Sequence, residues 1–196
     1  MLPKKPMILY HGSNQLFKSF DLSHVSEGTG VKFGYGIYLT ESEASAVHYS
    51  QPRNQDQSAD YYLYTIEIPD LVENNHITSA SPVSMEIVSL VSRSLNLSIP
   101  ADVCDKGKEF RKWVGCALTG AKKAKFAEEK AAAELLNNLG VIYNVWPTAQ
   151  TKPDGLKNIC VFNPSNVTIL KVEHIEIYQK NGKNLLVKGS KKEVAL

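Results

Sequence analysis

The sequence lacks the features that mark several classes of protein. It has only three cysteines, and they are far apart: Cys104, Cys116 and Cys160. They fit neither a zinc-binding pattern nor a disulfide framework, so we expect no metal site and a reducing compartment. No apolar run approaches the roughly 18 residues that a membrane-spanning helix needs, so we expect no membrane partner. The basic N-terminus has no long apolar segment behind it, which argues against a secretory signal and for a cytoplasmic protein, or one delivered into the cytoplasm of a target cell.

Charge of one sign is also scarce. The chain has 22 lysines and arginines against 20 aspartates and glutamates, a net charge of +2, which is too small to indicate nucleic-acid or membrane binding by itself. The proportions of hydrophobic (43%) and charged (21%) residues are ordinary for a globular domain. A length of 196 residues suits one domain. We predict a single domain over residues 1–188 and a tail over residues 189–196.

The N-terminal half predicts strands around a glycine-rich loop. Residues 7–10 are an apolar run that ends in His11-Gly12-Ser13-Asn14, a pattern typical of a strand that breaks into a turn. Residues 23–36 contain four glycines, which favour a loop because glycine adopts backbone conformations that side chains block. A short strand is expected at residues 37–39, and a longer one at residues 61–69, which are rich in aromatic and β-branched residues.

Four segments predict helices. The first follows Thr40, which forms a capping-box pattern with Glu43. The others have apolar residues at helical spacing and cover residues 83–95, 105–121 and about 122–139. Gly140 stands where a glycine that ends a helix belongs. Residues 83–139 are therefore expected to form a helical insertion.

The last part of the chain returns to strands. They are expected over residues 141–146, 159–162 and 167–172. Residues 174–179 and 185–188 flank Asn181-Gly182, a strong signal for a hairpin turn. Because strands and helices follow one another without regular βαβ alternation, the predicted fold class is α+β.

Two short motifs stand in the order and spacing of a known family. The first is Tyr10-His11-Gly12-Ser13, and the second is Gly34-Tyr35-Gly36-Ile37-Tyr38-Leu39-Thr40, which a second tyrosine, Tyr49, follows eleven residues after Tyr38. Together they resemble the diphtheria-toxin and poly(ADP-ribose) polymerase branch of ADP-ribosyltransferases, the His-Tyr-Glu branch. Residues 140–143 and 161–165 add a likeness to transferase domains of phage and mobile-element polyvalent proteins. The resemblance covers roughly residues 8–172, and it implies an ADP-ribosyltransferase-like split β-sheet core with flanking helices.

The resemblance implies a site that binds NAD as a substrate. Cleaving the bond between nicotinamide and ribose produces an oxocarbenium-like sugar, so the site needs aromatic faces, groups that fix the amide, and hydrogen bonds to the ribose. By likeness to the family, Tyr38 and Tyr49 sandwich the nicotinamide ring. The backbone of Gly12 approaches its carboxamide, and His11 bonds the 2′-hydroxyl of the adenosine ribose. The remaining expected NAD-binding residues are Ser13 and Gly36.

One position departs from the family pattern. Where the family begins a later strand with glutamate, this sequence has Asn158, so the expected catalytic set is His11, Tyr38 and Asn158. A carboxylate there would stabilise the developing positive charge and polarise the nucleophile, and losing one such contact commonly costs about a hundred-fold to a thousand-fold in rate. Asparagine keeps the hydrogen-bonding shape but cannot act as a base, so chain-building polymerase activity is not expected. Candidates for a replacement group are Asp154, Glu67 and Gln150.

The sequence leaves several functions open. The first is a mono-ADP-ribosyltransferase, a bacterial or phage toxin or effector that modifies a protein or nucleic acid and has an antitoxin or immunity partner. The second is a weak or inactive module that binds NAD or ADP-ribose, which Asn158 favours. The third, an NAD-using RNA 2′-phosphotransferase, would need arginines at the site, and the chain holds only three: Arg53, Arg93 and Arg111.

Basic residues concentrate in the segment 106–130. They are Lys106, Lys108, Arg111, Lys112, Lys122, Lys123, Lys125 and Lys130. Nearby acidic residues offset them in part, so a solvated helix face is the simpler explanation. The alternative is a docking surface for an acidic protein or a nucleic acid.

Overall fold

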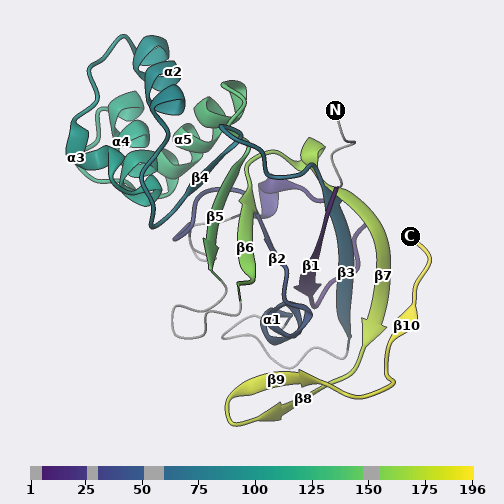
Figure 1. The fold of residues 1–196 in the computed structure, drawn as a ribbon. Coiled ribbons are helices and arrows are strands. Elements are labelled where there is room, and N and C mark those ends of the chain that lie inside the picture. The colour runs from purple at the N-terminus through teal and green to yellow at the C-terminus, as the bar shows by residue number, and fades with distance from the viewer. Residues whose placement is uncertain (1–5, 26–30, 51–59, 148–154) are drawn as a thin grey trace.

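The computed structural model describes residues 6–25, 31–50, 60–147 and 155–196, and it contains one large sheet with helices packed around it (Figure 1). The strands of this sheet are β1 (Met7–Ser13), β2 (Ile37–Thr40), β3 (Tyr61–Ile68), β4 (His76–Thr78), β5 (Tyr143–Pro147), β6 (Lys157–Val161), β7 (Thr168–Ile175) and β10 (Lys192–Glu193). They lie in the order β10-β7-β3-β1-β2-β6-β5-β4, antiparallel except for the parallel pair β4 and β5. The predicted α+β class is confirmed.

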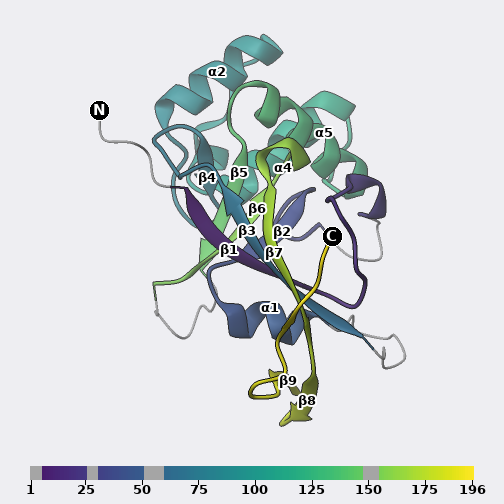
Figure 2. The same cartoon turned by 90° about the vertical axis from the view of Figure 1, so that its right-hand side faces the viewer.

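The helices lie at two places on the sheet. They are α1 (Glu43–Tyr49), α2 (Met85–Leu95), α3 (Ala101–Cys104), α4 (Gly107–Thr119) and α5 (Phe126–Asn138). Helices α2 to α5 lie together next to β4, at one edge of the sheet. Helix α1 lies apart from them, below β1 and β2 (Figures 1 and 2). Among the described residues, none of these helices is long and apolar enough to cross a membrane.

The sheet is divided between β1 and β2. In the described part of the chain a single residue pair, Tyr10 with Thr40, joins these two strands. By contrast, β1 pairs with β3 along its whole length, from Met7 to Ser13, and β2 pairs with β6 from Ile37 to Thr40. The expected split-sheet core with flanking helices is therefore present.

Strand alternation assigns each side chain to a face of the sheet. Successive side chains of a strand point to opposite faces, so the registers of β1, β2, β5 and β6 fix two sets. One face carries Tyr10, Gly12, Tyr38, Thr40, Asn144, Trp146, Asn158 and Cys160. The other carries the apolar core of Leu9, Ile37, Leu39, Tyr143, Val145, Ile159 and Val161, together with His11. The side chains of His11 and Tyr38 therefore project from opposite faces of the sheet.

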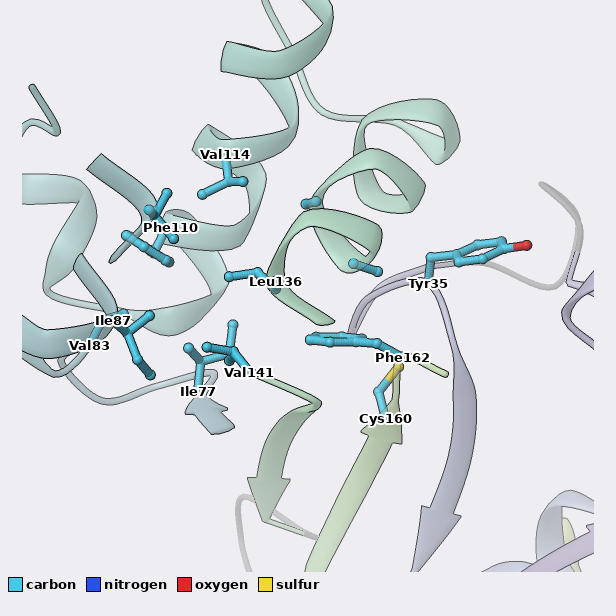
Figure 3. Close-up of a cluster of buried hydrophobic side chains, with 13 residues drawn as sticks. Tyr35, Ile77, Val83, Ile87, Phe110, Val114, Leu136, Val141, Cys160 and Phe162 are labelled. Atoms are coloured by element: carbon cyan, nitrogen blue, oxygen red, sulfur yellow. The ribbon is translucent and has the colours of Figure 1, made fainter. Parts of the chain in front are cut away.

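A shared apolar core joins the helices to β6 and to the segment before β2. Buried side chains of α2, α4 and α5, among them Ile87, Phe110 and Leu136, meet Cys160 and Phe162 at the end of β6 (Figure 3). Tyr35, just before β2, closes the same core. Each fully buried side chain of this size contributes about 1.5–3 kcal/mol, so the helices are firmly fixed to the segments that enter β2 and leave β6.

The structure corrects the expected turn after residue 10. His11, Gly12 and Ser13 continue β1, because β3 offers them Tyr64, Leu63 and Tyr62 as partners. A neighbouring strand overrides the local turn preference of these residues.

Smaller corrections concern caps and short elements. Ser42, not Thr40, is the N-cap of α1, since its side chain accepts from the amide of Ser45. Strand β4 and helix α3 were not predicted, and both are too short for periodicity to reveal.

The C-terminal residues fold against the domain. The hairpin of β8 (Ile177–Lys180) and β9 (Lys183–Leu186) turns at Asn181 and Gly182, which have φ of 52° and 71°, as predicted. The Asn184 side chain donates to the carbonyl of His48 at 3.0 Å and thereby fixes the hairpin to α1. Within the segment expected to be a tail, β10 pairs with β7.

Candidate functional site

The imidazole of His11 spans the division between β1 and β2. Continuing the ladder from Tyr10 and Thr40 would set Gly12 opposite Tyr38, but the strands do not pair there. Instead, Nδ1 of His11 lies 2.9 Å from the carbonyl oxygen of Tyr38. A carbonyl can only accept, so Nδ1 carries the proton and Nε2 keeps a lone pair in the neutral ring. The side chain thus replaces a missing ladder bond and presents an acceptor at the division.

The surroundings of His11 keep it neutral. Its ring lies edge-on to Phe20 at 5.2 Å between centroids, with Phe17 and Tyr64 at 6.2 Å. Burial among these rings lowers the pKa of His11 from its ordinary 6.5, although the Tyr38 carbonyl acts in the opposite direction. Near neutral pH the side chain can therefore accept a hydrogen bond from a hydroxyl group through Nε2.

Gly12 is in close contact with helix α1. A Cβ placed on Gly12 would lie 2.0 Å from the carbonyl oxygen of Ala46 and 3.0 Å from Cβ of Ser50, so no side chain fits. The absence of a side chain lets α1 rest directly on β1. Ser13, next in the strand, accepts from the amide of Gln15 at 3.0 Å through its hydroxyl, which leaves its hydroxyl hydrogen as a donor.

Tyr49 is the exposed aromatic residue of this region. It belongs to the same turn of α1 as Ala46 and Ser50, which flank Gly12, yet 65% of its surface is accessible. Its ring is tilted against that of His48, with 4.9 Å between centroids. An aromatic ring that the core does not use is suited to stack on a flat ligand.

The hydroxyl group and the ring of Tyr38 are both held by neighbouring residues. Its hydroxyl donates to the carbonyl of Gly34 at 2.9 Å and accepts from the amide of Phe33 at 3.2 Å. Burial raises the pKa of Tyr38 well above its ordinary value, so the phenol stays protonated. The ring meets Trp146 edge-on at 5.6 Å, and Trp146 in turn stacks on Phe33 at 4.1 Å. Tyr38 thus belongs to a wall of three aromatic rings.

Asn158 lies on the same face as Tyr38, on the neighbouring strand β6. It is two residues before Cys160, the partner of Tyr38. It lies near the start of β6, where it pairs with Thr40 on β2 and with Trp146 on β5. Its amide donates to the carbonyl of Pro147 at 3.2 Å. The neighbouring Glu41 carboxylate accepts from the amide of Lys157 at 2.6 Å, which places a negative charge beside the start of β6.

The three residues considered as replacements for the missing glutamate are not all described by the structure. Glu67 pairs with Ile8, three positions from Tyr64, the partner of His11. At about 3.3 Å a residue, that puts Glu67 about 10 Å from His11 along the strands, so it does not belong to the site. Gln150 and Asp154 lie outside the described residues. Sequence reasoning did not consider Glu41.

The second glycine of the Gly-Tyr-Gly motif has a packing role. A Cβ on Gly36 would lie 2.3 Å from the carbonyl oxygen of Val161 and 2.8 Å from Sγ of Cys160. Gly36 therefore lets β2 begin in direct contact with β6, which is the contact that brings Tyr38 and Asn158 onto one face.

Sequence reasoning missed three residues that organise the Tyr38 side of the site. They are Arg111, Asn144 and Trp146. Arg111 was counted with the basic face, but it is fully buried and paired with Glu129. A signal was present, because Arg111 follows the core residue Phe110 directly and is three residues from the core residue Val114. Asn144 gave no signal, since it stands inside an ordinary strand pattern.

One of three comparisons with known proteins gives a match. A family model described as ADP-ribosyltransferase in polyvalent proteins matches residues 5–171. The matched part contains β1, β2, α1 and β6, which carry the expected site residues apart from Gly36, just before β2, and it ends within β7. No curated protein and no solved structure gives a match. The hairpin and β10 lie beyond the matched part.

Proposed function

Because this chain belongs to the ADP-ribosyltransferases in polyvalent proteins, we propose that it is a mono-ADP-ribosyltransferase, which cleaves NAD and transfers ADP-ribose to a protein or nucleic acid. The observation that carries the proposal is the hydrogen bond from His11 to the carbonyl of Tyr38 across the divided sheet. The same region contains Gly12, against which the backbone of α1 packs, and the exposed ring of Tyr49. By likeness to the family, His11, Gly12 and Tyr49 are expected at the NAD site.

Each residue takes a distinct part in binding NAD. Nε2 of His11 accepts from a ribose hydroxyl, and its neutral state keeps that lone pair available. The nicotinamide ring stacks against Tyr49, with the Gly12 backbone near its carboxamide. Tyr38 forms the opposite wall, fixed by its bonds to the segment before β2. Binding the two ends of NAD in this way aligns its glycosidic bond for attack.

The chemical step needs little from the protein besides charge and orientation. The bond between C1′ and the nicotinamide nitrogen breaks, and nicotinamide leaves with the electron pair. The acceptor then bonds to C1′ and loses its proton. Asn158 can orient a ribose hydroxyl but supplies no negative charge, so we propose a slow transferase. The Glu41 carboxylate is the group best placed to compensate.

A second candidate is a module that binds NAD or ADP-ribose with little turnover. Asn158 favours it, because the position that usually carries a carboxylate lacks one. The RNA 2′-phosphotransferase is not favoured, since Arg111 is engaged by Glu129 and Lys32 inside the protein. NAD hydrolysis well above the uncatalysed rate would support the transferase over the binding module.

We also propose a role as a toxin or effector with a neutralising partner. The lysines of the segment 106–130 are the proposed docking face for that partner or for the acceptor, and the three that come just before α5 (Lys122, Lys123, Lys125) are exposed. Reversing the charge of these three should weaken target binding, and unchanged binding would refute the docking role.

The test is incubation of the purified protein with labelled NAD and a cell lysate. Label on protein or on nucleic acid supports the transferase and identifies the class of acceptor. Free ADP-ribose alone indicates hydrolysis, and NAD binding without any product supports the module. Neither binding nor product would refute both. His11→Ala, checked for folding by circular dichroism, should lose whichever activity is found.

A further inference from the structure

The segment before β2 is held through three consecutive carbonyl groups. Lys32 O accepts from Nη2 of Arg111 at 3.4 Å, Phe33 O from the amide of Asn144 at 2.7 Å, and Gly34 O from the hydroxyl of Tyr38 at 2.9 Å. The three donors come from α4, β5 and β2. Within the described parts of the chain no strand pairs with this segment, so side chains supply the hydrogen bonds that a ladder would otherwise give. Its position therefore depends on those side chains.

Arg111 is the donor that comes from the helical part. Its guanidinium is fully buried and bonds both carboxylate oxygens of Glu129 on α5, with Nε to Oε2 at 2.5 Å and Nη2 to Oε1 at 3.2 Å. Nη1 has no hydrogen-bond partner among the described residues. A Cβ placed on Gly34 would lie 3.4 Å from Nη1, so the guanidinium rests directly against the segment.

Stability alone does not explain why this buried ion pair is present. Apolar residues of similar volume commonly serve as well as a buried ion pair, and a buried donor without an acceptor is a cost. What the apolar alternative could not do is hold the carbonyl of Lys32. The position of the pair, between the helices and the segment, points to a role in placing the segment.

The segment is coupled to the aromatic wall. Phe33 donates its amide to the hydroxyl of Tyr38 and stacks its ring on Trp146. Trp146 lies next to Asn158 in the sheet. A shift of residues 32–34 would therefore be transmitted to the residues that form one side of the proposed NAD site.

We propose that Arg111 and Glu129 are positioning residues, which reach from the helices to fix residues 32–34 and, through them, Tyr38 and Trp146 at the NAD site. The consequence for NAD rests on the proposed function, whereas the placement of the segment does not. The two parts are therefore tested by separate measurements.

The first variant replaces both partners, Arg111→Met with Glu129→Leu. Removing both charges avoids an unpaired buried ion, so the fold is expected to survive. Trp146 serves as the reporter of the segment, in a Trp113→Phe background that removes the other tryptophan. The double variant should expose Trp146 to quenching by acrylamide and raise the KM for NAD about tenfold, the equivalent of one hydrogen bond to a charged group, with a smaller change in kcat.

Two further variants keep the test decisive. Leu136→Ala weakens the same apolar core but removes none of the three hydrogen bonds to the segment, so it should lower the melting temperature but leave quenching and KM unchanged. If the double variant does not fold, Glu129→Gln keeps the side-chain shape and one acceptor for Arg111, and a smaller shift in the same direction is expected.

The outcomes separate the two proposals. Wild-type quenching of Trp146 in the folded double variant, or in Glu129→Gln if that is the one that folds, would overturn the positioning role whether or not NAD is turned over. Equal shifts in Leu136→Ala would overturn it as well, because they would reflect general loosening. Increased quenching in the variant, together with no NAD binding by the wild-type protein, would support the positioning role and refute the proposed function.

Discussion

Adding a single methyl group at Gly12 should displace the helix that carries Tyr49. The new Cβ of Gly12→Ala would lie 2.0 Å from the carbonyl oxygen of Ala46 and 2.8 Å from its carbonyl carbon, where real Cβ contacts below 3.0 Å essentially never occur. The obstacle is the backbone of α1, so no rotation of a side chain relieves it. Helix α1 must retreat from β1 by about 1 Å.

The expected effects on stability and on activity differ in size. Overpacking of this kind typically costs about 1–3 kcal/mol, and in a domain of this length each kcal/mol lowers the melting temperature by about 2–4 °C. The protein should therefore remain folded at room temperature. The retreat moves Tyr49 away from β1, and a displacement of about 1 Å at a reacting site can reduce turnover about a hundred-fold.

The assay compares Gly12→Ala with a matched glycine elsewhere. A Cβ on Gly107, at the start of α4, would lie 2.5 Å from the carbonyl oxygen of Thr78, so Gly107→Ala meets a similar backbone obstacle away from the site. Both variants should lose stability in thermal unfolding, but only Gly12→Ala should lose NAD binding and hydrolysis. Wild-type hydrolysis in Gly12→Ala, or equal losses in both variants, would refute the assignment of Gly12 to the site.

Three other predictions test the remaining site residues. Asn158→Glu should raise NAD hydrolysis about a hundred-fold or more, with Asn158→Gln as the uncharged control; no gain would contradict the alignment of Asn158 with the family glutamate. Because burial lowers the pKa of His11 from 6.5, the unfolded chain binds that proton more readily, and the free energy of unfolding should fall as the pH drops below about 6.5. The melting temperature should therefore fall further between about pH 7.5 and about pH 5 in the wild type than in His11→Asn, and equal falls would contradict the burial argument. Tyr49→Ser should change stability by no more than about 0.5 kcal/mol, since the side chain is mostly exposed, yet weaken NAD binding about tenfold through lost stacking. Tyr178→Ser, another exposed tyrosine, is its control and should bind NAD normally.

Much of the secondary structure could be predicted because its signals are local. The hairpin at Asn181 and Gly182 follows from the two positive φ angles that such a turn requires. The three long helices follow from apolar residues at helical spacing. The turn expected at His11 was wrong for the opposite reason, since β3, some fifty residues later in the chain, keeps that stretch in the sheet.

The two motif glycines show the same limit at the site. Their presence indicated that another group comes close to the backbone, which at Gly12 was expected to be the carboxamide of NAD. What approaches is the protein itself: α1 at Gly12 and β6 at Gly36. The sequence could not identify these neighbours, because they come from distant parts of the chain or from a helix whose angle to the strand is set by packing.

The sequence alone determined which residues line the expected site, since the order and spacing of His11, Tyr38 and Tyr49 are properties of the chain. It also determined that Asn158 brings no charge. Only the tertiary structure decided that His11 forms a hydrogen bond across the divided sheet. It also decided that the hydroxyl of Tyr38 is hydrogen-bonded while Tyr49 stays exposed, and that Arg111 is buried and not part of a basic surface. Those properties depend on burial and on partners distant in sequence, and the folded arrangement is what creates both.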